Sequence, residues 1–337
     1  MSNSKNHSVA ILGSGESGMG AALLAKSKGI DVFLSDSGAI PEAKKTKLTK
    51  NRIPFEENGH SINALLKYEE VIKSPGIPDK AEVVQKLRAV GKPIISEIEF
   101  ASRYTNAKLI AITGSNGKTT TTLLTFHLLK SAGLNVGLGG NIGISLASLI
   151  LERDYDIIVL EVSSFQLDGM YDFKADTSLL LNITPDHLDR YNYDINLYAA
   201  SKLRIIQNQG VSELFICNVD DELISDRLKS VNLEVDKIGF SIKSKLENGA
   251  YLNNGELVVN QENTKLSIPV GDIPLIGKHN LYNTMAAILT ATRYGLNKDQ
   301  ISEGLKSFQN APHRLEYVAR VDGVRFINDS KATNVDS

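Results

Sequence analysis

The sequence predicts an α/β protein in which an N-terminal Rossmann-like parallel-sheet domain precedes a P-loop-type central ATPase domain with a small additional β element. Three observations support this fold class. Strand-like and helix-like segments alternate along the first third of the 337 residues, as in parallel βαβ units. A Gly-x-Gly-x-x-Gly motif stands at Gly13–Gly18, and a second glycine turn leads directly into Lys118 and Thr119.

The first domain is predicted from short apolar strands separated by helices. Ala21, Ala22, Leu24 and Ala25 give the helix-like segment Gly18–Lys28 an apolar face. Strand–helix alternation of this kind predicts a parallel sheet. We expect strands at Val9–Leu12, Val32–Leu34, Val71-Ile72 and Ile94-Ile95, and a further helix at Ala81–Val90.

The motif Gly13–Gly18 lies between the first strand and the first helix, and Asp36 ends the second strand. Glycines at these positions let the backbone bring N–H groups to a diphosphate at a helix N-terminus. An acidic residue at the end of the next strand can bind a ribose hydroxyl. NAD, FAD and a nucleotide-sugar diphosphate all fit this motif, and a tight turn without a ligand is the alternative.

A second phosphate-binding loop is predicted after the strand Leu109–Thr113. Gly114 and Gly117 allow a tight turn whose N–H groups approach an anion, and the following helix points its positive end at the same place. Lys118 adds a charge for the β- and γ-phosphates, and the Thr119 hydroxyl can ligate Mg²⁺. These features favour ATP or GTP over a turn without nucleotide.

This second loop is shorter than the general P-loop, Gly-x-x-x-x-Gly-Lys-Ser/Thr. Ile112 stands five positions before Gly117, where the general pattern has glycine. The first glycine of this loop is instead Gly114, and a glycine-rich strand-to-helix turn without nucleotide is the alternative interpretation.

Polar residues follow the next apolar strands. Glu161 follows the strand Asp156–Leu160, and His187 lies in an Asp/His/Asp cluster after the strand Ser178–Leu181. Open α/β sheets bind ligands at the carboxyl ends of their strands. Glu161 can therefore complete the Mg²⁺ site that the loop begins, and His187 can contact metal or substrate. The alternatives are a solvated strand-end acid and a structural histidine.

Three further segments organise this part of the chain. Arg103–Lys108 is the expected linker between the domains, and Asn253-Asn254-Gly255 predicts a hairpin turn. Lys202 lies on the predicted helix Tyr193–Gln207 and is, by its spacing alone, an ordinary surface lysine.

Together these segments resemble the Mur ligase family, the ATP-dependent amide ligases of peptidoglycan precursor synthesis. The short loop Thr113–Thr120 is the form found in that family, which accounts for the missing early glycine. The resemblance runs from Val9 to the last residue. Its distinguishing strings are Gly140-Asn141-Ile142-Gly143, Glu161-Val162-Ser163-Ser164-Phe165-Gln166-Leu167, Pro312-His313-Arg314-Leu315-Glu316 and Asn328-Asp329-Ser330-Lys331-Ala332-Thr333-Asn334.

The resemblance implies an acid–amino-acid ligase that adds D-glutamate to UDP-N-acetylmuramoyl-L-alanine. ATP would convert the substrate carboxylate to an acyl phosphate, which the amine of D-glutamate would attack through a tetrahedral intermediate. Lys118, His187 and Lys202 would be the catalytic residues. ATP would be bound by Gly114, Ser115, Asn116, Gly117, Lys118, Thr119, Thr120, Asn280, Arg314 and Asp329.

The resemblance also implies UDP, rather than NAD, at the first glycine-rich loop. Two Mg²⁺ ions would be held by Thr119, Glu161, His187 and Lys202, the last as the CO₂-derived carbamate that the family forms on the matching lysine. Thr333 would contact D-glutamate. The UDP-linked substrate would be bound by Glu16, Ser17, Asp36, Ser37, Gly76, Asn141 and His187.

We expect a UDP-binding domain at 1–103, an ATP-binding domain at 104–312, and the start of a C-terminal ligand-binding domain at 313–337. That third domain is a feature of the family, so we expect a truncated chain with weak or no turnover. The alternatives are another Mur-family or a folylpolyglutamate-type ligase and, from other classes, an NAD(P)-dependent oxidoreductase or a non-catalytic nucleotide-binding module. An oxidoreductase leaves Lys118, Thr119 and Glu161 unexplained.

The composition excludes several other classes. The chain is 42% apolar with a net charge of −2, so it has no basic field that would favour nucleic acid. Its one cysteine, Cys217, excludes an intrachain disulfide framework and fits a reducing compartment. No apolar run approaches the ~20 residues of a membrane span, and Met1–Ser8 lacks a signal-peptide core. We expect a cytoplasmic monomer without a nucleic-acid or membrane partner.

Overall fold

The structure, a computed structural model, describes residues 7–332 apart from 233, 263, 315 and 322. Its contacts divide the chain into two units. Unit 1 comprises residues 1–107, 139–155 and 163–173, and unit 2 comprises residues 108–138, 156–162 and 174–337. Two later segments therefore pack with the N-terminal one. The functional domain ranges 1–103, 104–312 and 313–337 stay a prediction.

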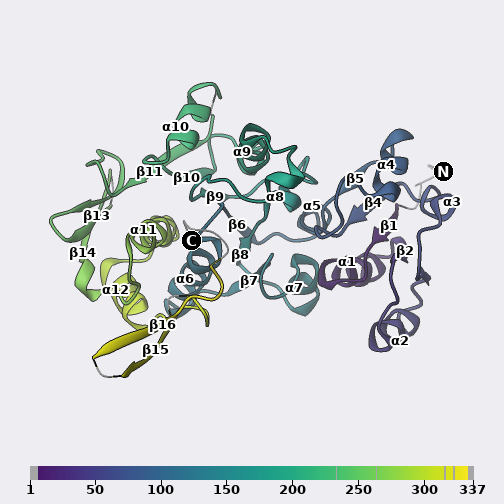
Figure 1. The fold of residues 1–337 in the computed structure, drawn as a ribbon, viewed down its shortest axis with the longest axis horizontal. Coiled ribbons are helices and arrows are strands. Elements are labelled where there is room, and N and C mark those ends of the chain that lie inside the picture. The colour runs from purple at the N-terminus through teal and green to yellow at the C-terminus, as the bar shows by residue number, and fades with distance from the viewer. Residues whose placement is uncertain (1–6, 233, 263, 315, 322, 333–337) are drawn as a thin grey trace. The chain divides into compact units, whose positions relative to one another are not determined.

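Unit 1 contains a five-stranded sheet in the order β3-β2-β1-β4-β5, with every neighbouring pair parallel (Figure 1). The central strand, β1, is apolar because both of its faces are covered, and Val9 to Leu12 are fully buried. The chain adds strands on one side of β1 and then crosses to the other, so a ligand-binding switch point falls at the carboxyl end of β1. The strands are β1 (Ser8–Leu12), β2 (Asp31–Ser35), β3 (Phe55–Glu56), β4 (Glu70–Lys73) and β5 (Ile94–Ile95).

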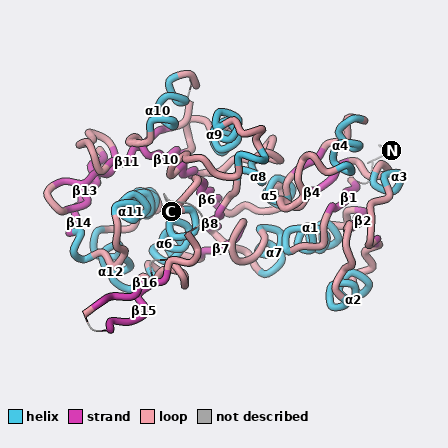
Figure 2. Tube along the Cα trace, viewed as in Figure 1, coloured by secondary structure: helices cyan, strands magenta, loops and turns pink. Residues whose placement is uncertain are grey.

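The helices of unit 1 include two from the later segments, α7 and α8. Helix α1 begins directly after the first glycine motif and buries the predicted apolar face, and it packs against α5 and α7. Strand–helix alternation is visible along the whole unit (Figure 2). The helices are α1 (Glu16–Ser27), α2 (Glu42–Lys50), α3 (Ile62–Leu65), α4 (Glu82–Ala89), α5 (Glu97–Ser102), α7 (Leu146–Glu152) and α8 (Ser164–Leu167).

Unit 2 contains a nine-stranded sheet in the order β14-β13-β12-β11-β10-β9-β6-β8-β7. The pairs of β6 with β8 and β9 are parallel, whereas β12, β13 and β14 pair antiparallel and form the small additional β element. The predicted hairpin turn is confirmed, with Asn254 and Gly255 at φ 47° and 80° between β12 and β13. The strands are β6 (Lys108–Thr113), β7 (Val136–Gly140), β8 (Ile157–Glu161), β9 (Thr177–Leu180), β10 (Leu214–Asn218), β11 (Asp236–Ser241), β12 (Gly249–Asn253), β13 (Glu256–Gln261) and β14 (Thr264–Pro269).

Helices α6, α11 and α12 pack together over one face of this sheet (Figure 1). Alternate residues of the strands, such as Ile110 and Ile112 of β6, point into the same core as Leu124 and Leu128 of α6. The helices are α6 (Lys118–Ser131), α9 (Ile195–Leu203), α10 (Glu222–Lys229), α11 (Lys278–Arg293) and α12 (Lys298–Ser307), with short 3₁₀ turns η1 (Leu188–Arg190), η2 (Arg204–Ile206) and η3 (Val270–Asp272).

A separate antiparallel hairpin, β15 (Glu316–Val321) and β16 (Val324–Asn328), follows α12. Across the described part of the chain, no helix combines the length and the apolar character that a membrane crossing requires. The α/β fold class, with a parallel-sheet first unit and a mixed-sheet second unit, is confirmed.

Candidate functional site: two glycine-rich loops at strand ends

The second glycine-rich loop leaves β6 between the two strands that flank it, β8 and β9. Gly117 is the N-cap of α6 and has φ 81°, a left-handed conformation that favours glycine. A Cβ there would also lie 2.3 Å from Oδ1 of the buried Asn283. Both constraints require glycine, so the loop is built to direct the N-terminal amides of α6 toward one place.

Two lysine side chains converge on this loop from different helices. Lys118 Nζ donates to the carbonyls of Gly114 and Ser115, each at 2.8 Å, and Lys202 Nζ also donates to Gly114 O at 2.8 Å. Lys202 is only 1% exposed and lies 4.5 Å from the centre of the Tyr198 ring. The surface-lysine interpretation of Lys202 is therefore wrong, because α9 turns this side chain into the interior.

Burial lowers the pKa of Lys118, although the attraction of Glu161 and Asp186 opposes that shift. Glu161 ends β8 and is 2% exposed. The predicted strand-end carboxylate thus acts electrostatically on the loop lysine. Two lysine side chains and a helix N-terminus thus meet at this loop, an arrangement that suits the binding of an anion.

Arg314, an expected ATP contact, also lies at the loop. Its Nη2 donates to Thr119 Oγ1 at 3.0 Å, and Thr120 Oγ1 donates to Asn310 Oδ1 at 3.3 Å. Residues that follow α12 are therefore joined to the first turn of α6. These contacts bring together residues almost two hundred positions apart in the sequence.

The oxygen donors around the loop fit Mg²⁺. The described residues contain no cluster of three or more His, Cys, Asp or Glu side chains that could hold a metal by themselves. Mg²⁺ takes one or two carboxylates and completes its shell with phosphate oxygens and water. Glu161 and the Thr119 hydroxyl match that requirement.

Sequence reasoning missed a polar network that fixes the loop. Asn182 follows β9; its Oδ1 accepts from Asn116 N at 2.8 Å, and its Nδ2 donates to Asn116 O at 3.0 Å. Ser115 Oγ donates to Thr184 O at 2.8 Å and to Tyr198 OH at 3.2 Å. The sequence signal for this network is the position of Asn182, which directly follows a predicted strand in the same segment as His187.

The remaining predicted site residues of unit 2 lie on α11, in the loop after β9 and in the turn after β16. Asn280 is buried at the start of α11, where it accepts from Asn283 Nδ2 at 3.0 Å and so reaches Gly117 only through that residue. His187 has φ 50°, a side chain that is 58% exposed, and its Nε2 3.7 Å from Asp186 Oδ2. Asp329 lies in the turn after β16. Thr333 lies outside the described residues.

The first glycine-rich loop is held by a carboxylate. Asp36 Oδ2 accepts from Ser14 N at 2.6 Å, and its Oδ1 accepts from Gly38 N at 2.9 Å. Burial by itself raises the pKa of Asp36, but hydrogen bonds from Gly38 and Ser14 outweigh that effect and leave the pKa lowered. Lys44 Nζ donates to Ser14 O at 2.6 Å. Asp36 therefore shapes the loop itself, whatever it also binds.

The structural basis for having no side chain differs among the glycines of this loop. Gly13 has φ 93°, and a Cβ on Gly18 would lie 1.9 Å from Gly13 O, so strand and helix could not approach. Gly15 has φ −63°, and a Cβ there would meet nothing within 4 Å. The space beside Gly15 is thus open, which fits the close approach of a diphosphate.

Other residues predicted for the UDP-linked substrate lie near the carboxyl edge of the unit 1 sheet or on its later segment. Gly76 follows β4, in a turn that begins with Ser74 N donating to Leu12 O at 3.0 Å. Glu16 opens α1 and accepts from Ser148 Oγ at 3.0 Å. The other three are Ser17, Ser37 and Asn141, of which Ser37 and Asn141 are exposed.

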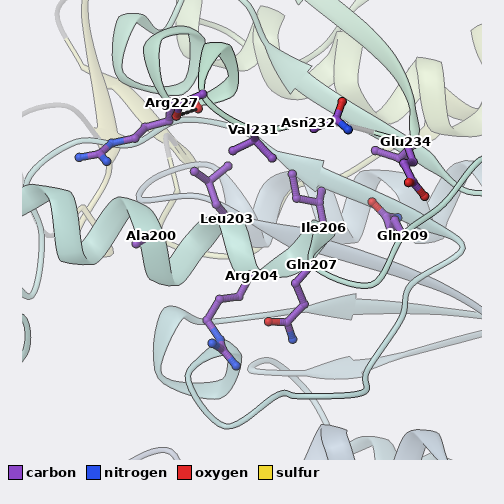
Figure 3. Close-up of a pocket in the computed structure, with 12 residues that line it drawn as sticks. Ala200, Leu203, Arg204, Ile206, Gln207, Gln209, Arg227, Val231, Asn232 and Glu234 are labelled. Carbon is purple, nitrogen blue, oxygen red and sulfur yellow. Dashed lines mark hydrogen bonds between the residues drawn. The ribbon is translucent and has the colours of Figure 1, made fainter.

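Unit 2 contains a cavity of about 530 Å³ (Figure 3). It is lined by residues of α9, η2 and α10 and of the following loop, including Leu203, Arg204 and Arg227. None of the predicted site residues lines it. This cavity is therefore not one of the predicted sites.

Fold and site together define the class: a nucleotide-binding α/β protein with a P-loop-type unit and a Rossmann-like unit. Family profiles agree, since the one described as Mur ligase middle domain matches residues 112–291 and the one described as MurD N-terminal domain matches residues 8–83. The chain belongs to the Mur ligase family.

Its relatives are similar over nearly the whole chain. A UDP-N-acetylmuramoylalanine--D-glutamate ligase of Bacteroides fragilis is 50% identical over 329 residues, which are 98% of this chain and 74% of the relative. The protein of the same name from Christiangramia forsetii is 49% identical with the same coverage. The chain thus spans about three quarters of the length of these relatives.

Solved structures show the same fold at low identity. The UDP-N-acetylmuramate:L-alanyl-gamma-D-glutamyl-meso-diaminopimelate ligase from Neisseria meningitides has a TM-score of 0.62 and 21% identity, with 90% of this chain and 99% of that chain covered. The UDP-N-acetylmuramate-alanine ligase from Thermotoga maritima has a TM-score of 0.54 and 22% identity, with 96% and 74% covered.

Proposed function

We propose that this protein is an ATP-dependent ligase that joins D-glutamate to UDP-N-acetylmuramoyl-L-alanine in peptidoglycan precursor synthesis. The observation that carries the proposal is the convergence of Lys118 and Lys202 on Gly114 O, in a chain half identical to ligases of that name. Positive charge is needed where a phosphoryl group moves to a carboxylate, because both groups are anions, and Lys118 would supply it.

The reaction follows from the chemistry of a carboxylate, which is a poor acyl donor. Transfer of the γ-phosphoryl group of ATP to the substrate carboxylate gives an acyl phosphate and ADP. The amine of D-glutamate then attacks the carbonyl carbon, and a tetrahedral intermediate expels phosphate. In this scheme Lys118 stabilises the charge on the phosphoryl oxygens, and the N-terminal amides of α6 bind them.

Mg²⁺ would neutralise phosphate charge at this site. Thr119 and Glu161 are the residues whose oxygens fit it, and His187 is a further candidate at the same sheet edge. We also propose that Lys202 acts as a carbamate, which would replace the cation by a carboxylate-like ligand for a second Mg²⁺. Its burial supports this, since a neutral amine, the form that reacts with CO₂, is favoured in an apolar environment.

The first loop would hold the UDP moiety. The open space beside Gly15 can admit the diphosphate, and Asp36 keeps Ser14 in place while remaining at the strand end where a ribose hydroxyl binds. Ser17, Ser37 and Gly76 are the expected neighbours, with Asn141 for the muramoyl-alanine portion. Thr333 stays the expected contact for D-glutamate.

Binding measurements test this proposal independently of turnover. Calorimetric titration should show binding of UDP-N-acetylmuramoyl-L-alanine and MgATP but not of NADH, and Asp36→Ala should abolish only the first. A turnover assay should then show ADP release that depends on D-glutamate, with L-glutamate as the matched control. NADH binding without UDP binding would overturn the proposal in favour of an oxidoreductase.

Lys202→Ala tests the carbamate. We expect a loss of turnover of about 10²-fold or more that a small carboxylate such as acetate partly restores, because it can replace the missing anion. Full activity of Lys202→Ala would contradict the carbamate. The monomeric state and the cytoplasmic location of the protein stay predictions.

A further inference from the structure

Glu97, the first residue of α5, is a buried carboxyl group that the proposed reaction does not use. It is 2% exposed, and its Oε1 accepts from Ala147 N at 2.6 Å. Its Oε2 has no hydrogen-bond partner among the described residues. An ionised carboxylate with an unsatisfied buried oxygen is costly, so this environment favours the neutral acid.

The charges around Glu97 act in the same direction. Burial raises the pKa of Glu97 to about 8; the hydrogen bond from Ala147 lowers it, and the nearby carboxylate of Glu16 on α1 raises it. The first turn of α7 contributes only hydroxyl and apolar side chains. On α5 itself, Glu99 accepts from the amides of residues 171–173, and Arg103 is ion-paired with Glu70 and Glu99.

Helix α7 is held at its first turn from two sides. Glu97 of α5 holds the Ala147 amide, while Ser148 Oγ donates to Glu16 Oε1 at 3.0 Å on α1. Ser145 Oγ donates to Ser148 Oγ at 2.8 Å, and Gly20 of α1 is so close that a Cβ there would lie 2.2 Å from Ser145 Oγ. The segment before α7 is therefore tied to the helix that begins at the first glycine-rich loop.

Asn141 lies in the short loop between β7 and the α7 N-cap, Ser145. We propose that Glu97 is a positioning residue for the UDP-linked substrate: by fixing the first turn of α7 against α5 and α1, it holds the loop that carries Asn141. This inference rests on the proposed function. Ionised Glu97 would be a buried charge beside Glu16, and moving the start of α7 into water would relieve both costs.

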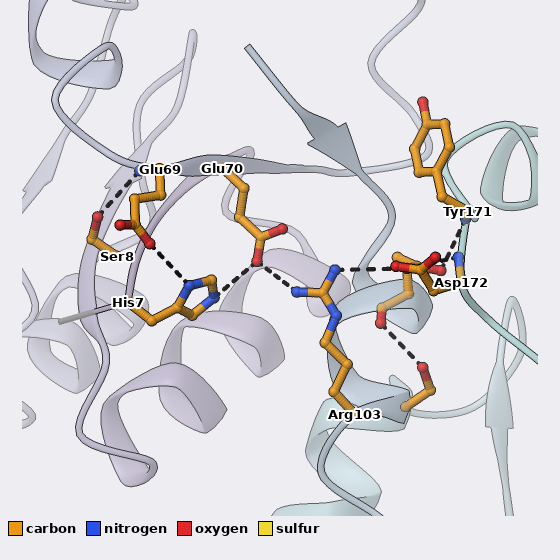
Figure 4. Close-up of polar contacts among 9 residues, drawn as sticks. His7, Ser8, Glu69, Glu70, Arg103, Tyr171 and Asp172 are labelled. Carbon is orange, nitrogen blue, oxygen red and sulfur yellow. Dashed lines mark hydrogen bonds and ion pairs between the residues drawn. The ribbon is translucent and has the colours of Figure 1, made fainter. Parts of the chain in front are cut away.

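Glu99 provides a matched comparison two residues further along the same helix. Figure 4 shows the polar contacts of its neighbours Arg103, Tyr171 and Asp172. It is 1% exposed, yet it accepts from Tyr171 N, Asp172 N and Phe173 N at 2.9–3.1 Å and lies 3.6 Å from Arg103 Nη2. The charge of Glu99 is thus satisfied where that of Glu97 is not. Glu99→Gln tests general damage to α5.

Affinity for UDP-N-acetylmuramoyl-L-alanine, measured by calorimetry at pH 7 and pH 9, tests the proposal. The wild type should bind about tenfold more weakly at pH 9, because Glu97 titrates near pH 8. Glu97→Gln keeps a neutral acceptor for Ala147 N, so it should bind like the wild type at pH 7 and lose the pH-dependent weakening. Glu97→Ala should bind weakly at both pH values, and Glu99→Gln should keep the wild-type pH dependence.

A second readout needs no ligand. Hydrogen exchange of the Ala147 amide, compared at matched pH, should be faster in the wild type than in Glu97→Gln above pH 8 and equal below pH 7. Identical pH profiles for the two proteins in both measurements would overturn the inference. Absence of UDP-compound binding by folded wild type at pH 7 would instead overturn the proposed function, and amide exchange would still decide whether Glu97 holds α7.

Discussion

The two glycine-rich loops of this chain have similar sequences but opposite partners. In unit 1, a carboxylate, Asp36, accepts from the loop amide of Ser14. In unit 2, two ammonium groups, Lys118 and Lys202, donate to the loop carbonyl of Gly114. The first loop therefore has a carboxylate at its amides and one lysine, Lys44, at the carbonyl of Ser14, whereas in the second loop two lysines meet at one carbonyl.

This difference separates two kinds of phosphate chemistry. A diphosphate that only has to be bound can rely on backbone amides and a helix N-terminus. A phosphoryl group that has to be transferred also needs positive charge at the reacting phosphate, and in the proposed function Lys118 of the second loop supplies it. The partners of a glycine motif therefore say more about its function than the glycines do.

Lys118→Ala should have the largest effect, because it removes the charge that distinguishes the second loop. We expect ligase turnover, measured as ADP release, to fall on the order of 10²–10³-fold. Lys130→Ala is the matched control, since Lys130 is exposed at the far end of the same helix. Equal turnover of Lys118→Ala and the control would remove the functional contrast between the loops.

Gly117→Ala should affect folding. A non-glycine residue at φ 81° is strained, and the new Cβ would collide with the hydrogen-bonded Asn283. We expect the free energy of unfolding in urea to fall by about 2–3 kcal/mol. Adding Asn283→Ala should relieve the collision but not the strain, so a double variant no more stable than Gly117→Ala would show that the collision contributes nothing.

Gly15→Ala, in the first loop, should weaken ligand binding and leave folding stability nearly unchanged. Its backbone suits alanine and its Cβ meets no atom, so stability should change by less than about 1 kcal/mol. The methyl group would occupy the space left for the diphosphate, so calorimetry should show roughly tenfold or weaker binding of UDP-N-acetylmuramoyl-L-alanine. Unchanged affinity would show that the diphosphate does not approach Gly15.

Asp36→Asn should have the smallest effect on stability, and that effect should disappear over a narrow range of acidic pH. The pKa of Asp36 is lowered from 3.8, so its carboxylate stabilises the fold above that pH, and the contribution is lost as the pH falls through the folded-state value. The difference in unfolding free energy between wild type and variant should shrink below pH 4. Asp31→Asn, at the exposed start of the same strand, controls for the loss of one negative charge; an equal shrinkage there would exclude a specific role for Asp36.

The sequence predicts features that depend on neighbouring residues. Both glycine loops, the strands that precede them and the hairpin turn at Asn254 follow from local backbone requirements, and the structure has them. The sequence does not reveal that Lys202 is buried or that Asn182 fixes Asn116, because those contacts join residues 66 and 88 positions apart. Nor does local patterning assign residues 139–155 and 163–173 to unit 1, since Glu97 and Glu99 bind these segments through backbone amides that carry no sequence signal.

The assignment of residues 139–155 and 163–173 to unit 1 has a consequence for synthesis on the ribosome. A nascent chain that ends at residue 107 contains all five strands of the unit 1 sheet, yet both acidic anchors of α5 still lack their amide donors. Unit 1 can complete its packing only after residue 173 has emerged from the ribosome. By then the first strands of unit 2 have emerged too. The maturation of the two units is thus interleaved in time, and an excised N-terminal fragment needs those later segments to be a stable protein.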